Sequence, residues 1–402
     1  MKLFYKLKTF FWAAGLTGFL LLFHPVLIML ITRGRDLSQA ATVDSSSQIQ
    51  IVYIFICAFV IFNELITNNQ VILKKMILSS PIKFLFLFNI LSFISAFWST
   101  NPVLTLYRSF ECLTFLLLIN LTIKKLLVKF TYTQVINWTI WFAFWNLFTG
   151  ILFRYALIGI SSLSIPFLPS RLFFPLFFFI IIILGKKRLP KIVVLCVSIL
   201  GFSNKIFIGI ALGFIAFVRG SLKNKLTSLI AFIILGFMLV LFDSDKLLLN
   251  TLFYGRDSVG IEDASGRKQL WTYLINAGLK VPYFGYGFSA GEADLIEQSY
   301  WKGAINSHNA LISAFVNTGL VGLILIIIFF LKSFFIALKF KENSKKLAFL
   351  STIILITIVS LSSPGIGGRV YGSWIPSVYL ISLMVGLSYF NFIKLYQTRN
   401  KK

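Results

Sequence analysis

His308 is the residue whose type and setting most favour acid–base chemistry. It lies in the run Asn-Ser-His-Asn at 306–309, directly before a long apolar segment. Histidine is the side chain best suited to accept a proton near neutral pH, so His308 is a candidate for acid–base chemistry. A histidine that caps the following helix is the alternative. The chain has one other histidine, His24, which stands beside Pro25 inside an apolar run and is expected to be structural.

Arg267 is a candidate for binding an anion. It lies in the first turn of an amphipathic stretch that predicts a short loop helix, which Gly278 ends and Pro282 prevents from continuing. The apolar face of this helix consists of Leu270, Trp271, Leu274 and Ile275. Cations usually favour the other end of a helix, so an arginine in the first turn suits a bound anion that guanidinium and backbone N–H groups hold together. A solvated surface arginine explains the residue equally well.

Further basic residues are expected at the membrane boundary that faces away from the cytoplasm. Lys and Arg are disfavoured there, so a group of them indicates an anionic partner. The group consists of Lys205, Arg108, Arg154, Arg171 and Arg369. Glu111 follows Arg108 by three residues, and this helical spacing is expected to pair the two charges.

Two other patterns carry weaker signals. Gly285 and Gly287 lie in the run Phe-Gly-Tyr-Gly-Phe at 284–288, which predicts a tight turn and only weakly suggests a phosphate loop. Asp243 and Asp245 have the spacing of a metal-binding carboxylate pair, but no histidine or third acid stands near them in the sequence. A metal site is therefore not expected.

The composition places all of these residues in a membrane protein. Hydrophobic residues make up 58% of the 402 residues and charged residues 13%. Soluble domains carry roughly 45–50% apolar and about 25% charged residues, so this chain cannot cover its surface with polar groups. We therefore expect an all-α polytopic membrane protein. The net charge of +25 does not indicate nucleic acid, because its distribution follows membrane topology.

Apolar runs of about 20 residues predict about twelve transmembrane helices. These runs are 10–31, 50–66, 83–98, 105–122, 133–153, 171–185, 191–202, 206–219, 226–242, 310–331, 347–363 and 375–391. Most basic residues fall on one side, which the positive-inside rule assigns to the cytoplasm together with both termini. The chain then divides into 1–242 with nine helices, one long, partly helical periplasmic loop at 243–309, and 310–402 with three helices.

In this setting the motifs resemble those of the O-antigen ligase and polymerase superfamily, bacterial glycosyltransferases that use lipid-diphosphate-linked sugars. His308 is followed after a short interval by the run Gly-Leu-Val-Gly, in which Gly319 and Gly322 stand, as in the histidine motif of that family. Arg267 and Gly278 match the family's arginine–glycine spacing. The resemblance is sharpest over this stretch and also covers the predicted twelve-helix layout.

The resemblance implies a metal-independent, inverting glycosyl transfer without a cofactor, on the periplasmic face of the bacterial inner membrane. The donor would be an oligosaccharide on undecaprenyl diphosphate. His308 would activate the acceptor hydroxyl, and Arg267 would stabilise the leaving diphosphate. The further cations expected to hold the diphosphate are Lys205, Arg171, Arg154 and Arg369. Besides donor, acceptor and membrane lipid, a chain-length regulator is a possible partner.

Three functions stay open within this framework. A polymerase moves the growing glycan onto the next lipid-linked repeat unit, whereas a ligase moves the finished glycan onto lipid A–core. The turn Ser-Asn-Lys at 203–205 resembles the serine–lysine turn of polymerases more than the serine–arginine of ligases, which favours the polymerase. A flippase for lipid-linked sugars is the alternative of another class, although the sequence shows neither an internal repeat nor charges at the bilayer midplane.

Overall fold

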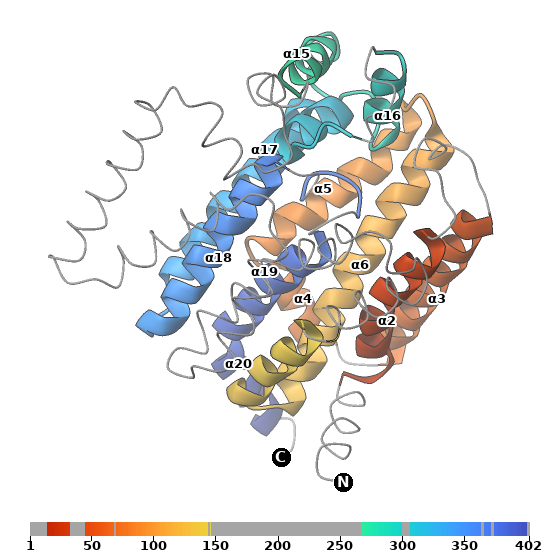
Figure 1. Ribbon diagram of the computed structural model, residues 1–402. Helices are drawn as coiled ribbons and strands as arrows, with labels where there is room; N and C mark the ends of the chain where they lie inside the picture. Colours follow the sequence, from red (N-terminus) through yellow and green to blue (C-terminus); the bar gives the residue numbers. More distant parts are fainter. Residues whose placement is uncertain are drawn as a thin grey trace, which may run out of the picture.

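The computed structural model describes residues 14–32, 45–67, 70–143, 145, 267–299, 306–362, 366–370 and 374–399. In these ranges the chain forms a bundle of α-helices, and two short helices cap one end of the bundle (Figure 1). The predicted spans between 171 and 242 lie outside the described residues, as do Lys205, Arg154, Arg171, Asp243 and Asp245.

The other predicted spans coincide with helices. They are α2 (Gly15–Thr32), α3 (Ser45–Thr67), α5 (Ile82–Ile94) with the short η2 (Ser95–Phe97), α6 (Pro102–Lys129), an unlabelled helix at 132–143, α17 (Ala310–Leu338), α18 (Asn343–Ser362) and α19 (Trp374–Ser388). The described chain also contains α4 (Val71–Leu78), α15 (Arg267–Gly278), α16 (Ala290–Glu297) and α20 (Phe390–Arg399). Of these additional helices, only α15 was predicted.

Length and composition identify which described helices could cross a membrane. The segment Gln48–Thr67 of α3 and the whole of α17 are apolar and long enough. The pair of α4 and α5 also qualifies when taken together, although the two helices are bent by 82° at their junction. These helices make the protein a helical membrane protein, while the twelve-helix layout stays a prediction.

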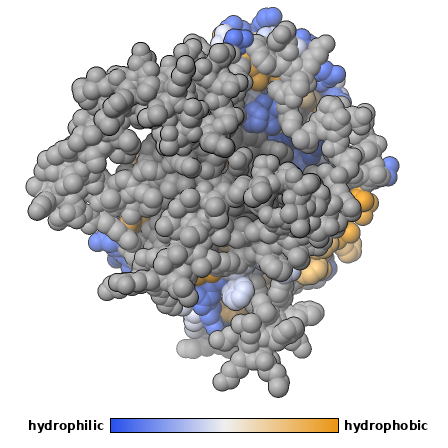
Figure 2. All heavy atoms as spheres, in the orientation of Figure 1, coloured by the Kyte–Doolittle hydropathy of each residue, from blue (hydrophilic) through white to orange (hydrophobic). Residues whose placement is uncertain are grey.

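One face of α3 is suited to lipid. Phe55, Phe59 and Phe62 are exposed, with Phe59 at 72%, and they recur at the three- and four-residue spacing of one helical face. Figure 2 shows hydrophobic side chains along the edge of the molecule where α2 and α3 lie, and hydrophilic ones at the end where α15 and α16 lie. Large exposed phenylalanines are unfavourable in water, so this face fits contact with lipid tails.

The long helix α6 forms the centre of the bundle. It packs against α2, α3, α4, α5, α19 and α20. Core side chains such as Phe115, Trp138 and Tyr379 are fully buried around it, and the Tyr379 hydroxyl lies 3.0 Å from the Thr139 hydroxyl. The helix α17 packs beside α5 and α18, and its first turns carry α15 and α16 (Figure 1).

Gly319 interrupts α17. Its backbone angles, φ 69° and ψ −165°, are not helical, so α17 consists of a short first arm and a longer second part. The second part, 320–338, is about 28 Å long at 1.5 Å per residue, close to the thickness of a bilayer core. The first arm is almost completely buried under α15 and α16. The break therefore separates a membrane-length helix from the polar end of the molecule.

Candidate active site

The segment 282–287 fills the break in α17. In an uninterrupted helix the carbonyls of Val316 and Asn317 would accept hydrogen bonds from residues four positions later. Here the Val316 carbonyl accepts from the N–H of Tyr286 at 2.9 Å. The Asn317 carbonyl accepts from the N–H of Gly287 at 3.0 Å. The loop thus satisfies the carbonyl groups that the break leaves without helical partners.

The same loop also satisfies the N–H groups on the other side of the break. Leu320 N–H donates to the carbonyl of Pro282 at 2.7 Å. Val321 N–H donates to the carbonyl of Tyr283 at 3.5 Å. Loop and helix therefore exchange backbone bonds in both directions, which fixes the loop on α17 as one rigid unit.

Three hydrogen bonds bind this loop and the following Phe288 to the bundle as well. Phe288 N–H donates to the Ser95 hydroxyl at 2.9 Å, and the Thr105 hydroxyl donates to the Phe288 carbonyl at 2.9 Å. Trp98 donates its indole N–H to the Phe284 carbonyl at 3.2 Å. The loop is consequently held by α5, α6 and α17 together.

The predicted motif glycines lie at points of close packing. Gly319 has a positive φ, and a Cβ there would lie 2.2 Å from the Tyr283 carbonyl carbon. Gly285 also has a positive φ, and a Cβ there would lie 2.5 Å from the Val316 carbonyl oxygen. Added Cβ atoms would also meet neighbours under 3.0 Å away at Gly278, Gly287 and Gly322. Gly285 and Gly319 serve the loop–helix contact, and the N–H groups of the turn from Gly285 to Phe288 donate to protein acceptors, which disfavours a phosphate loop.

His308 stands directly before the N-cap of α17. The cap is Asn309, whose side-chain oxygen accepts from the N–H groups of Leu311 at 3.0 Å and Ile312 at 3.2 Å. A capping role for His308 is therefore wrong. His308 itself is partly exposed, and its φ of 54° is uncommon for a residue other than glycine. Such backbone strain costs on the order of 1–3 kcal/mol and needs support from the surrounding structure.

Hydrogen bonds from several directions supply this support. His308 N–H donates to the Asn306 side-chain oxygen at 2.9 Å. The carbonyl of Ser307 accepts from the indole N–H of Trp271 at 2.7 Å, and its hydroxyl donates to the Asn309 carbonyl at 3.1 Å. Ser307 N–H donates to Glu292 at 2.7 Å. The peptide that leads into His308 is thus fixed from α15, from α16 and from its own turn.

Glu292 was not singled out by the sequence analysis. Its carboxylate is buried, with the residue 6% exposed, and it also accepts from the Ser313 hydroxyl at 2.6 Å and the Asn317 amide at 3.3 Å. Glu292 N–H in turn donates to the side-chain oxygen of Asn317 at 3.0 Å. The sequence does contain a pattern that indicates a polar partner for this helix: Ser313 and Asn317 stand four residues apart in a segment that is otherwise strongly apolar.

The helix α15 brings Arg267 toward the His308 turn. Leu270, Leu274 and Ala277 bury one face of α15 against α16 and α17, whereas Ile275, predicted on that face, is 39% exposed. Trp271 bonds the peptide before His308, as described above. Arg267 is the first residue of α15 and stands one turn before Trp271, so the two positions share a face of the helix. The predicted helix and its end at Gly278 are confirmed.

The segment 366–370, which contains Arg369, reaches the same end of the bundle. The Cys112 thiol of α6 lies 3.9 Å from the Gly368 carbonyl. A Cβ on Gly367 would lie 2.6 Å from the carbonyl of Ala310, the first residue of α17. Arg369 therefore belongs to a segment that packs between α6 and the start of α17. Helix α17 begins at Ala310, two residues after His308.

Arg108 is paired, as the sequence predicts. Its guanidinium donates to Glu111 at 2.9 Å, and the second carboxylate oxygen accepts from Gln50 of α3 at 2.7 Å. Both charged residues are buried. His24 packs edge-on against Phe115, with ring centroids 4.5 Å apart, which agrees with its expected structural role.

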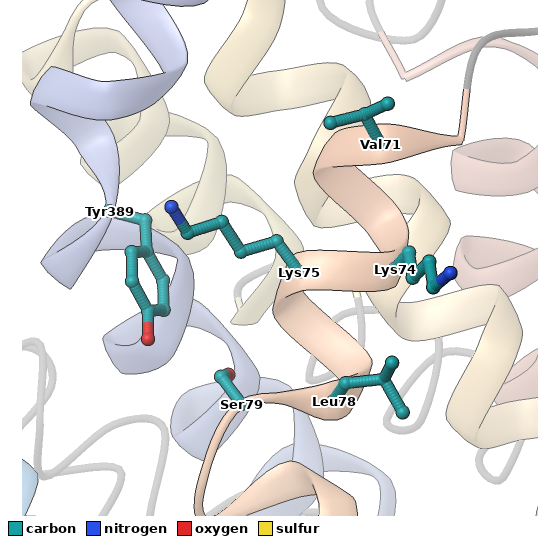
Figure 3. A pocket seen from close by; sticks show the side chains of 6 residues that line it. All are labelled: Val71, Lys74, Lys75, Leu78, Ser79 and Tyr389. Atoms are coloured by element: carbon teal, nitrogen blue, oxygen red, sulfur yellow. The ribbon is translucent and has the colours of Figure 1, made fainter.

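A cleft at the other end of the bundle is separate from this site. It lies between α4 and the junction of α19 and α20 and is lined by Val71, Lys74, Lys75, Leu78, Ser79 and Tyr389 (Figure 3). Lys75 extends across it, and its ammonium lies 3.3 Å from the ring centroid of Phe392. Figure 1 places α4 and α20 away from α15 and α16, so the cleft and the His308 turn are at opposite ends.

Comparison with known families gives one match. Residues 189–327 match the family model described as O-antigen ligase. The matched segment contains Lys205, all of α15 and α16, the His308 turn and the break in α17. No curated protein matches the chain.

Proposed function

We propose that this chain polymerises lipid-linked oligosaccharide repeat units at the periplasmic face of the inner membrane, because residues 189–327 match the family model described as O-antigen ligase. The family match and the apolar helices make it a bacterial membrane protein of glycosyl-transferring type. The polymerase, the undecaprenyl diphosphate carrier and the periplasmic side are our proposal.

The reaction is a single displacement at the sugar. The acceptor hydroxyl attacks the anomeric carbon of the donor glycan and forms the new glycosidic bond, while the bond from that carbon to the diphosphate breaks. His308 takes the proton of the hydroxyl, and the electron pair leaves with the diphosphate on its lipid. One displacement inverts the configuration of the anomeric carbon.

Cationic side chains stabilise the leaving diphosphate. Arg267 binds it from the first turn of α15, where backbone N–H groups and guanidinium favour an anion. Lys205, Arg154, Arg171 and Arg369 contribute further positive charge. With these groups the reaction needs no metal ion, since the charge that develops on the diphosphate meets fixed cations.

The observation that carries the proposal is the rigid support of the His308 turn. A partly exposed histidine is held in a strained conformation by three side chains of different segments, Trp271, Glu292 and Asn306. A purely structural turn gains nothing from strain at an exposed histidine, whereas acid–base catalysis requires its ring in one place.

A deletion strain tests the proposal. Complementation with the wild type is expected to restore a ladder of surface glycan on a gel, whereas His308→Ala and Arg267→Ala leave a band with a single repeat unit. Asn276→Ala, an exposed position on α15, is the matched control and should restore the ladder. A full ladder from His308→Ala at normal protein level would contradict the proposal.

The ligase is the second candidate, because the matching family model carries that description. For a ligase, the deletion would remove glycan from lipid A–core while long chains accumulate on the carrier lipid. The lysine at position 205 is our reason for preferring the polymerase, since lysine binds phosphate as a point charge where a ligase would use a forked arginine.

A further inference from the structure

We propose that Glu292 is a positioning residue for His308, acting through the peptide bond between Ser307 and the histidine. The inference deepens the proposed function and rests on it for the catalytic role of His308. The hydrogen bonds of Glu292 to the His308 turn do not depend on that catalytic role. No motif that the sequence analysis recognised includes this residue.

The carboxylate of Glu292 accepts hydrogen bonds from three donors, on Ser307, Ser313 and Asn317. Ser307 contributes a backbone N–H, which can only donate. The Asn317 amide is oriented by the bond from Glu292 N–H to its oxygen, so its NH₂ group must point at the carboxylate. The Ser313 hydroxyl accepts from that NH₂ group and donates to the same carboxylate oxygen. An ionised carboxylate, which is an acceptor only, matches this set of donors.

The bonds of Glu292 join three segments at one buried point. Its own helix α16 contributes the carboxylate, α17 contributes Ser313 and Asn317, and the turn before α17 contributes Ser307. Asn317 is also one of the residues whose carbonyl accepts from the loop at the break. The carboxylate therefore connects the position of His308 to the rigid loop–helix unit below it.

Loss of the carboxylate would act on His308 directly. The bond to Ser307 N–H fixes the peptide whose other end is the nitrogen of His308, and this residue holds a φ of 54°. Without the bond, a buried N–H group loses its acceptor and the turn can relax toward an ordinary conformation. A shift of the ring by about 1 Å is enough to lower a rate about 100-fold when proton transfer needs a fixed distance.

Steady-state kinetics on purified protein in lipid nanodiscs, with lipid-linked repeat units as substrate, test the role in catalysis. Glu292→Gln keeps the volume but replaces one of the two acceptor oxygens by an NH₂ donor, which cannot satisfy all of the facing donors, and kcat is expected to fall about 10- to 100-fold while KM stays within about threefold. Glu297→Gln, at an exposed position of the same helix, is the control and should keep the kcat of the wild type. A kcat of Glu292→Gln within twofold of the wild type would overturn the inference.

A second variant keeps the kinetic test decisive if the first variant does not fold. Glu292→Asp keeps the charge, but its carboxylate is one methylene short of Ser307, so we expect the same selective loss in kcat. If Glu292→Gln does not fold, Glu292→Asp carries the kinetic test by itself, and wild-type kcat in this variant would overturn the inference.

A spectroscopic readout separates this inference from the proposed function. The chain has only two histidines, so ¹⁵N-histidine labelling gives imidazole signals from His24 and His308 alone. Glu292→Gln should shift or broaden the His308 signals and leave those of His24 in place. Unchanged His308 signals would overturn the positioning role even where kcat falls. Full activity of His308→Ala would instead overturn the proposed function, while the signals still report on Glu292.

Discussion

At the scale of the residue, two positions combine an uncommon backbone conformation with hydrogen bonds that stabilise it. His308 and Gly319 both have positive φ values, one at the candidate site and one at the break in α17. Backbone hydrogen bonds from the loop 282–287 hold the conformation at Gly319, and side-chain hydrogen bonds from Asn306, Trp271 and Glu292 hold the turn at His308. The strained residues are therefore the places where a small substitution should have large effects.

Gly319→Ala tests the break. A Cβ at this position would overlap the backbone of Tyr283, and alanine disfavours this φ, so we expect a loss of stability of about 3 kcal/mol or more. The thermal unfolding temperature in detergent should fall sharply and the glycan ladder should be lost. Leu331→Ala, an exposed position in the second part of α17, is the control and should change the unfolding temperature little.

Trp271→Phe tests the contact between α15 and the His308 turn. Phenylalanine keeps an aromatic ring but removes the N–H that bonds the Ser307 carbonyl, so a loss of about 1 kcal/mol is expected together with lower activity. Activity can be followed as the rate of chain elongation in membranes with equal protein content. An elongation rate equal to that of the wild type would show that this bond does not help to position His308.

At the scale of the element, much of the helical pattern follows from the sequence. Apolar runs predict α2, α3, α5, α6, α17, α18 and α19, because a bilayer selects for continuous apolar length. The helix α15 and its end at Gly278 also follow, since an amphipathic face predicts the helix and Gly278 ends it. Local patterns of this kind depend only on neighbours along the chain.

The features missed in the sequence depend on contacts between distant segments. The break at Gly319 needs the loop 282–287 to replace its hydrogen bonds, and that exchange cannot be recognised from either segment alone. The role of Glu292 likewise requires Ser307, Ser313 and Asn317 to meet it. For the same reason the sequence identified His308 but assigned a possible cap to it, whereas Asn309 is the cap.

Asn309→Ala tests the start of α17. The substitution removes the acceptor for two N–H groups in the first turn, which should cost about 1 kcal/mol and loosen the residue next to His308. Thermal unfolding and elongation rate are the measurements. Asn309→Asp keeps the acceptor and should retain wild-type stability. If both variants unfold at the same temperature as the wild type, the cap does not stabilise this helix.

At the scale of the whole molecule, polar and apolar parts are segregated. Exposed phenylalanines cover α3, while α15 and α16 present hydrophilic side chains at one end (Figure 2). The second part of α17 has about the length of a bilayer core and leads from this end to the turn before α18. This arrangement fits a position of α15 and the His308 turn at a membrane surface, and our proposal is that this surface faces the periplasm.

Cysteine labelling tests that orientation. Lys280→Cys lies beyond α15, and Lys341→Cys lies in the turn between α17 and α18; both positions are exposed. An impermeant maleimide applied to spheroplasts should label Lys280→Cys and should reach Lys341→Cys only after the membrane is opened. The native Cys57 and Cys112 are buried and should give little background, and the third cysteine, Cys196, is replaced by serine in the labelled strains. The reverse pattern would place the candidate site in the cytoplasm and contradict the proposed reaction.

The most direct test of the central claim is chain elongation by purified protein in nanodiscs that contain lipid-linked repeat units as the only glycan. The account predicts that the wild type forms a ladder of longer lipid-linked chains with release of the free lipid diphosphate, and that His308→Ala at equal unfolding temperature forms none. A ladder of wild-type intensity from His308→Ala would contradict the account, because another group would then have to activate the acceptor hydroxyl.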